Sequence, residues 1–158
     1  MSEQNDLTLE GFLCNSNLLS LDLPSLKRID LCQCRLTRIE KKLFSNLPNL
    51  ESLYLSLNEL VVLDKDLFKN LIALRKLNLS DNKIAKSEWS VFKWDYQWKD
   101  SNFFYFGLSR LDPGIFSNLS SLEELYLFQN ELVELDMDLF KNKAVLKKLN
   151  LSNNKITK

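Results

Sequence analysis

The sequence predicts a solenoid, a fold in which similar coils of chain stack along one axis. The first sign is a phenylalanine that recurs with a 24-residue period, at Phe44, Phe68, Phe92, Phe116 and Phe140. Asparagine keeps the same interval, at Asn58, Asn82, Asn130 and Asn154. A fixed period of this length is typical of coils that bury their apolar faces only against one another. Such folds present long surfaces more often than closed catalytic pockets.

Within each period, two apolar positions separated by one polar position predict a short strand. We number the positions of each unit from residues 26, 50, 74, 98, 122 and 146, so that positions 4 and 6 are mostly leucine. Alternation of this kind is typical of a strand with one buried face. Position 5 then faces outward, and in five of the units it holds Tyr54, Asn78, Asn102, Tyr126 and Asn150.

The asparagine at position 9 predicts a buried ladder of side-chain amides. An amide can satisfy backbone groups where the chain turns away from a strand. Cys34 takes this position in the first unit, and we interpret it as structural, in line with Asn58, Asn82, Asn130 and Asn154. The phenylalanine at position 19 should fill the far side of each coil as a continuous aromatic spine.

The strand region of four units has a common sequence pattern. Residues 50–60 read LESLYLSLNEL, residues 74–84 LRKLNLSDNKI, residues 122–132 LEELYLFQNEL and residues 146–156 LKKLNLSNNKI. These segments match L-x-x-L-x-L-x-x-N-x-L, so the chain resembles the leucine-rich-repeat family. The 24-residue unit is most similar to the "typical" subclass of Toll-like receptor ectodomains, Slit-type proteins and small leucine-rich proteoglycans. The resemblance implies an α/β fold, a right-handed horseshoe with a concave parallel β-sheet and short helical or irregular segments on its convex side.

We divide the chain into an N-terminal cap or degenerate repeat at 1–25 and six 24-residue repeats at 26–158, the last of them truncated. Residues 49–86 match residues 121–158, which indicates that three units were copied as a block. The sequence ends soon after a predicted strand without a polar capping unit, so we interpret it as a fragment. An uncapped solenoid exposes core and a strand edge, and we expect self-association through the C-terminal edge.

The fourth unit departs from the pattern over residues 87–106, SEWSVFKWDYQWKDSNFFYF. One interpretation is that oversized aromatic residues repack a degenerate unit, and the other is an aromatic patch built for a partner. Phe104 and Tyr105, at positions 7 and 8, point outward if the resemblance holds. Because adjacent strands lie about 4.8 Å apart, we expect Phe104 and Phe128 to be neighbours.

Composition argues against several classes of function. Lys plus Arg and Asp plus Glu both number 21, so the chain lacks the basic footprint of a nucleic-acid binder. It has no apolar run long enough to cross a membrane. Histidine is absent, which removes imidazole bases and most zinc sites. Glycine-rich nucleotide-binding motifs are missing as well. We therefore expect no catalysis, no cofactor and no metal.

The predicted function is recognition of a protein or peptide ligand on the concave face, within a larger receptor or secreted protein. Outward aromatic side chains on a rigid sheet make good anchors, because they bury a large area at low entropic cost. The predicted binding residues are Tyr54, Asn78, Asn102, Phe104, Tyr105, Tyr126 and Phe128. The alternatives are a structural or adhesion component of a matrix and an intracellular scaffold or adaptor. The start, MSEQND, lacks the form of a secretory signal. The predicted location is extracellular or at the cell surface if a signal peptide lies upstream, and cytoplasmic otherwise.

Overall fold

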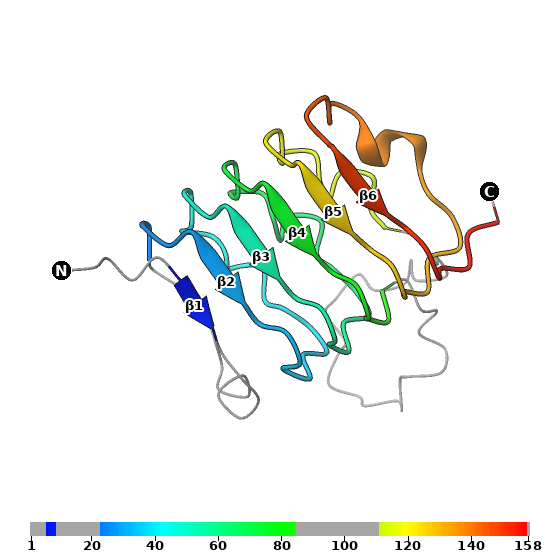
Figure 1. Cartoon of the computed structure of the whole chain (residues 1–158), viewed down its shortest axis with the longest axis horizontal. Coiled ribbons are helices and arrows are strands. Elements are labelled where there is room, and N and C mark those ends of the chain that lie inside the picture. The colour runs from blue at the N-terminus through cyan, green and yellow to red at the C-terminus, as the bar shows by residue number, and fades with distance from the viewer. Residues whose placement is uncertain (1–5, 9–22, 85–110, 158) are drawn as a thin grey trace, which may run out of the picture.

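The computed structural model describes residues 6–8, 23–84 and 111–157. These residues form a six-stranded parallel sheet whose strands follow one another in sequence order (Figure 1). Each strand is three residues long: β1 (Asp6–Thr8), β2 (Arg28–Asp30), β3 (Ser52–Tyr54), β4 (Lys76–Asn78), β5 (Glu124–Tyr126) and β6 (Lys148–Asn150). The helical structure of the described residues is one 3₁₀ turn, η3 (Met137–Phe140). The predicted solenoid with a parallel sheet is confirmed.

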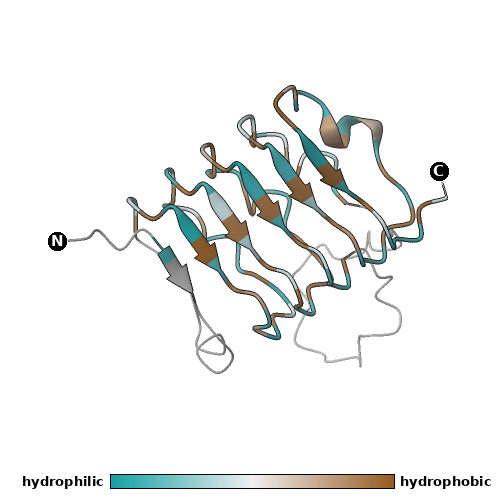
Figure 2. Ribbon diagram, viewed as in Figure 1, coloured by the Kyte–Doolittle hydropathy of each residue, from teal (hydrophilic) through white to brown (hydrophobic). Residues whose placement is uncertain are grey.

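The strands form one wall of the core because their central residues point inward. Figure 2 shows hydrophilic and hydrophobic residues succeeding one another along the strands. The central residues Ile29, Leu53, Leu77 and Leu125 are fully buried, and so are the leucines two positions later, Leu31, Leu55, Leu79 and Leu127. The flanking strand residues are more exposed and face away from the core. Alternation along the chain thus becomes separation between two faces of one sheet.

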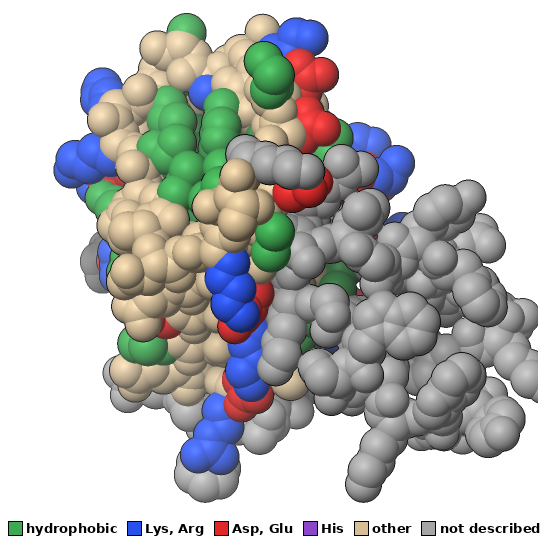
Figure 3. Space-filling model, turned by 90° about the vertical axis from the view of Figure 1, so that its right-hand side faces the viewer, with side chains coloured by type: hydrophobic (Ala, Val, Ile, Leu, Met, Phe, Trp, Pro, Cys, Tyr) green, Lys and Arg blue, Asp and Glu red, His purple; other side chains and the backbone are tan. Residues whose placement is uncertain are grey.

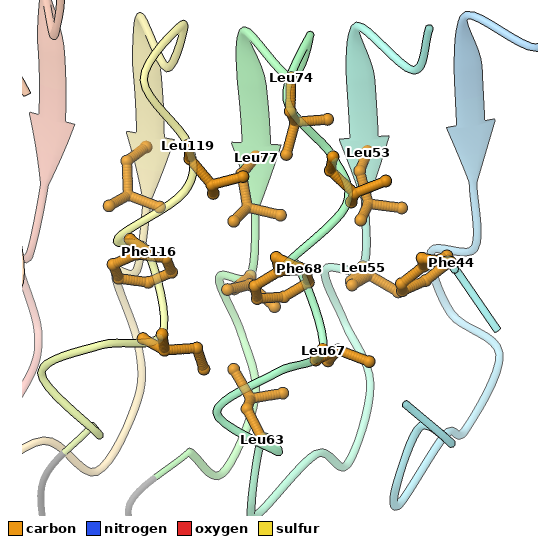
Figure 4. Close-up of a cluster of buried hydrophobic side chains, with 14 of the residues drawn as sticks. Phe44, Leu53, Leu55, Leu63, Leu67, Phe68, Leu74, Leu77, Phe116 and Leu119 are labelled. Carbon is orange, nitrogen blue, oxygen red and sulfur yellow. The ribbon is translucent and has the colours of Figure 1, made fainter. Parts of the chain in front are cut away.

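Phenylalanine rings form the opposite wall of the core. Phe44 and Phe68 stack with their ring centroids 6.5 Å apart, and Phe68 and Phe116 stack at 6.4 Å. Figure 4 shows these three rings in a row, opposite leucines of the strands. Phe140 is half-buried near the last strand, and Phe92 lies outside the described residues. The core is therefore a continuous layer between the sheet and the rings.

One prediction about the order of the coils is wrong. β4 pairs directly with β5, with Lys76 beside Glu124 and Asn78 beside Tyr126. The two strands are thus separated by two periods of the repeat, where the prediction required one. A strand from the fourth predicted unit therefore does not lie between them. The opposite wall agrees, because Phe68 stacks directly on Phe116.

The N-terminal segment contributes a strand to the sheet. β1 pairs in parallel with β2, and Asp6 lies beside Arg28. The step from Asp6 to Arg28 is slightly shorter than the 24-residue period, which explains why the segment is out of phase with the later units. Beyond this strand, the assignment of residues 1–25 as a cap or degenerate repeat stays a prediction.

Asparagine side chains connect the coils through their backbones, and Asn82 is representative. Its Oδ1 accepts the N–H of Leu60 in the preceding coil at 3.0 Å. Its Nδ2 donates to the carbonyl of Leu55 in that coil and to the carbonyl of Leu79 in its own, both at 3.0 Å. The same bonds recur at the other ladder asparagines: Asn58, Asn130 and Asn154. Among the described residues, no buried side-chain nitrogen or oxygen lacks a partner.

The residue before each ladder position has a left-handed backbone. In the five coils the φ angle is positive at Gln33, Leu57, Asp81, Gln129 and Asn153, between 53° and 58°. This region costs an ordinary L-residue about 1–2 kcal/mol. In four of the five coils the following residue is the ladder asparagine, and its amide helps to hold the turn: Asn58 donates to the carbonyl groups of Leu55 and Ser56, just before Leu57.

Leu57 tests the cost of this turn. Its side chain is 50% exposed, so its size matters little to the core. Leu57→Val should lower the free energy of unfolding by at least about 1 kcal/mol, because a β-branched residue fits the left-handed region poorly. Leu57→Asn should leave stability unchanged or raise it, because asparagine tolerates that region. Urea denaturation measures both. Ile72→Val, at a similarly exposed site without a positive φ, is the control, and equal losses at Leu57 and Ile72 would contradict the assignment.

The ladder predicts unequal costs for one substitution at two places. Asn82→Ala should lower the free energy of unfolding by about 1–3 kcal/mol, because it leaves buried backbone groups of two coils unpaired. Asn154→Ala removes similar bonds but should cost less, because Asn154 is only partly buried and water can reach the released groups. Lys83→Ala, which removes only an exposed ion pair with Glu59, should cost about 0.5 kcal/mol or less. Equal melting temperatures for all three variants would contradict the ladder.

Candidate functional site

The exposed face of the sheet places aromatic and amide side chains in one row. Strand register sets Tyr54 directly beside Asn78, Asn78 beside Tyr126, and Tyr126 beside Asn150. Neighbouring strands are about 4.8 Å apart, so the two tyrosines flank one asparagine within about 10 Å. All four residues are partly buried. The sheet thus brings together three of the predicted binding residues: Tyr54, Asn78 and Tyr126.

The ring of Tyr54 lies beneath a cation. The guanidinium of Arg28 stands 4.2 Å from the ring centroid, and it also forms an ion pair with Asp30 at 3.0 Å. Burial opposes the charge, but hydrogen bonding and charge interactions with Tyr54 and Asp30 outweigh it and raise the pKa of Arg28. The guanidinium therefore stays charged and holds the ring by a cation–π contact.

Tyr126 is held instead by a carboxylate. Its hydroxyl donates to Glu124 Oε2 at 3.0 Å, and Glu124 Oε1 pairs with Lys148 at 3.1 Å and with Lys76 at 3.7 Å. Burial, and then the neighbouring carboxylate, raise the pKa of Tyr126. The hydrogen bond from Lys148 lowers the pKa of Glu124, against the effect of burial. At neutral pH the phenol is therefore protonated and the carboxylate is charged.

The asparagines of this row present hydrogen-bond donors. Asn78 Oδ1 accepts from the backbone N–H of Ser80 at 3.0 Å and from its hydroxyl at 2.7 Å. Asn150 repeats this arrangement with Ser152. Among the described residues, the Nδ2 group of Asn78 has no acceptor. The oxygen is thus engaged within the chain, and the amide N–H groups remain available to a ligand.

Position 7 carries the remaining predicted aromatic residues. Phe128 is half-buried after β5. The strands next to β5 are β4 and β6, so the strand adjacency behind the expected contact of Phe104 with Phe128 is absent, and the contact itself stays a prediction. Phe104, with Asn102 and Tyr105, lies outside the described residues.

The same position holds Cys32 in the coil of β2. Its Sγ lies 3.0 Å from the hydroxyl oxygen of Ser56. Burial, as the largest influence, raises the pKa of the Cys32 thiol, which favours its neutral form. Cys32 is a free thiol, whereas Cys34 is disulfide-bonded and donates its backbone N–H to Asn58 Oδ1. Of the two, only Cys32 could act as a thiol.

Two rows of alternating charge border the face, and sequence reasoning missed them. Position 2 alternates in sign across five coils through Lys27, Glu51, Arg75, Glu123 and Lys147, and position 10 through Arg35, Glu59, Lys83, Glu131 and Lys155. Lys27 pairs with Glu51 at 3.0 Å, Lys147 with Glu123 at 2.8 Å, and Lys83 with Glu59 at 2.8 Å. The sequence contained a signal of this pattern. A fourth unit placed beside β4 would set Lys99, at position 2, next to Arg75, which carries the same charge.

The exposed face of the sheet offers groups for non-covalent contacts. No group of three or more His, Cys, Asp or Glu in the part of the chain described is placed to hold a metal ion. Nor is any helix there long and apolar enough to cross a bilayer. The face supplies aromatic rings, amide donors and paired charges, which suit a surface ligand.

The ion pairs of Glu123 and Glu124 predict loss of stability in acid. Hydrogen bonds from Lys147 and then Arg75 lower the pKa of Glu123 below its usual 4.5, and the bond from Lys148 lowers that of Glu124. A carboxylate with a lowered pKa stabilises the fold above its unfolded-state pKa, and this contribution disappears as pH falls through the folded-state pKa. The melting temperature should therefore decrease as the pH is lowered below about 4.5. The double change Glu123→Gln and Glu124→Gln should lower it at pH 7 and reduce its dependence on pH. An unchanged slope would contradict this account.

Comparison with known proteins places these features in a family. The family model described as "Leucine rich repeat" matches residues 24–84 and 106–157. A search of curated proteins finds no match. The two matched stretches adjoin the junction where β4 pairs with β5, and together they cover more than half of the chain.

Solved structures share the fold. Toll, in the Toll–Spatzle complex from Drosophila, is 24% identical with a TM-score of 0.67, over 94% of this chain and 19% of that one. TLR13, in its complex with ssRNA13, is 25% identical with a TM-score of 0.68, over 86% and 16%. The internalin InlF from Listeria monocytogenes is 22% identical with a TM-score of 0.58, over 85% and 31%. The chain spans less than a third of the length of each. With its stacked coils and the match of the family model, this chain belongs to the leucine-rich-repeat family.

Proposed function

We propose that this chain is a recognition module that binds a protein or peptide across the exposed face of its sheet. The observation that carries the proposal is the row in which Tyr54 and Tyr126 flank Asn78 on three neighbouring strands. Aromatic side chains on a rigid sheet bury a large area at small entropic cost. Leucine-rich-repeat domains are generally recognition modules, and the proposal assigns no catalysis to this one.

The polar groups around the rings suit a peptide. Amide donors of Asn78 and Asn150 can bond the carbonyl groups of an extended chain lying across the strands. Arg28 and Lys148 are already paired with carboxylates, so they orient the tyrosines more than they attract a ligand. We infer that the rings supply most of the affinity and the amides the register.

The comparisons support a macromolecular ligand. Toll is bound to Spatzle, a protein, whereas TLR13 is bound to single-stranded RNA. In the present chain the net charge is zero and charges of opposite sign alternate along the face, which disfavours a polyanion. We therefore propose a protein or peptide ligand, and a place for the chain within a larger receptor or secreted protein at the cell surface or outside the cell.

Alanine substitutions on the two sides of the solenoid test this function. Peptides selected from a random displayed library against the full chain provide the probe. Tyr54→Ala and Tyr126→Ala should each weaken binding of a selected peptide by about 1–3 kcal/mol, because each removes an aromatic anchor. Asp64→Ala and Lys141→Ala, exposed on the opposite side, are the matched controls and should bind as the unaltered chain does. Titration calorimetry measures all four.

Two outcomes would count against the concave face. The first is loss of binding in the opposite-side controls with normal binding in both tyrosine variants. The second is binding of single-stranded RNA with a steep salt dependence and no dependence on either tyrosine. Tyr126→Phe separates the contribution of the ring from that of the hydroxyl, because it keeps the ring and removes only the hydrogen bond to Glu124.

A further inference from the structure

The face of the β6 coil that points away from β5 exposes apolar side chains. Leu149 in β6 is 41% exposed, whereas its counterpart in β4, Leu77, is fully buried. Three further core positions of the β6 coil are only partly buried: Leu146, Leu151 and Ile156. Figure 3, which looks at this end of the molecule, shows hydrophobic side chains gathered on it with charged side chains nearby.

The backbone of this edge lacks the partners that inner coils have. In the β4 coil, the N–H of Leu79 donates to Tyr126 O at 2.9 Å and the N–H of Ile84 donates to Asn130 Oδ1 at 3.0 Å. The N–H groups of Leu151 and Ile156 hold the same positions in the β6 coil. Among the described residues they have no acceptor. The edge is thus a template for a further parallel strand.

The β6 coil is nearly a copy of the β4 coil. Residues 146–156 read LKKLNLSNNKI and residues 74–84 read LRKLNLSDNKI. Both coils are basic at positions 2, 3 and 10, through Lys147, Lys148 and Lys155 in one and Arg75, Lys76 and Lys83 in the other. The open face beyond β6 therefore carries nearly the same side chains as the face of the β4 coil that packs against β5.

The occupant of that covered face is acidic. The β5 coil packs there and places glutamates at the same three positions: Glu123, Glu124 and Glu131. Arg75 Nε donates to Glu123 at 2.7 Å, and Lys76 lies 3.7 Å from Glu124. Asn130 of this coil also donates to the carbonyl of Leu79 at 3.0 Å. Opposite charges and the ladder amide together fit the coil to its neighbour.

We propose that the face beyond β6 is a docking surface for a further leucine-rich coil of the β5 type, acidic at positions 2, 3 and 10. Its position 9 carries an asparagine whose Oδ1 accepts the N–H of Ile156 and whose Nδ2 donates to the carbonyl of Leu151. A basic coil is disfavoured by the three lysines. This surface is separate from the exposed face of the sheet, and it does not depend on the proposed function.

A second copy of this chain fits the surface less well. Its acidic coils, those of β3 and β5, are covered on both sides by neighbouring strands. Among the described residues, its free edge at β1 offers one carboxylate at the matching positions, Asp6 at position 3. One carboxylate against three lysines leaves two of the charges unmatched.

An extension of the intact chain tests the proposal. After Lys158, a copy of residues 135–145 continues the coil, and a copy of residues 122–132 then supplies the acidic strand. The matched control carries lysine in place of the three glutamates in the added copy only. We expect the acidic extension to raise the melting temperature by roughly 5 °C. It should also slow hydrogen exchange at the amides of Leu151 and Ile156, and at that of Asn153, whose counterpart in the β4 coil, Asp81, donates to Phe128 O. The lysine extension should do neither, and salt should narrow the difference between the two proteins.

Several results would overturn the proposal. One is equal melting temperatures with fast exchange at these three amides in both extended proteins. Another is equal protection by the acidic and lysine extensions, since charge would then play no part. A third is a dimer of the unextended chain, seen by sedimentation, that protects these amides, because a second copy would then be the occupant.

Discussion

The structure depends on satisfying the backbone of strands that are only three residues long. A strand this short pairs few of the polar groups in its coil, and unpaired buried groups are costly. The ladder asparagines remove that cost, because each bonds the backbone of its own coil and of the coil before it. They also hold the positive-φ turn that follows the strand. No coil is therefore complete without a neighbour, and stability is shared along the stack.

Strands held in register turn repeating positions into rows on the surface. Because β3, β4 and β5 are in register, Tyr54, Asn78 and Tyr126 form one line although they are far apart in sequence. The same register sets glutamates between basic residues at the borders of the face. Exposed ion pairs add little stability individually. Their alternation has a stronger effect on the order in which the coils stack, because a coil stacked on the wrong neighbour would set like charges side by side. The geometry that displays a binding surface thus also specifies which coil fits which.

Most of the architecture could be predicted from the sequence, because inward positions and turn positions are constrained in every coil. Leu53, Leu77 and Phe68 are buried as their places in the repeat require. The order of the coils could not be read from the period. β4 and β5 pair although they are two whole periods apart in sequence. Because the separation is a whole number of periods, the residues after β5 keep the same positions in the repeat whether β4 pairs with the next unit or with the one after it. Periodicity measures distance along the chain, whereas pairing depends on which faces match. For the site, Tyr54 and Tyr126 were placed on the exposed face, but Asn78 as their shared neighbour required the sheet order.

The duplicated block explains how β4 and β5 match. Within residues 49–86 an acidic coil comes first and a basic coil second, and residues 121–158 repeat that order. Where two such blocks meet, the basic end of one contacts the acidic start of the next, as Arg75 contacts Glu123. The junction between blocks therefore uses the same contact, between an acidic coil and a basic coil, that occurs within each block. Copying the block also copied its basic end, which is why the face beyond β6 has the charges, the leucines and the free N–H groups that accept an acidic coil at β4.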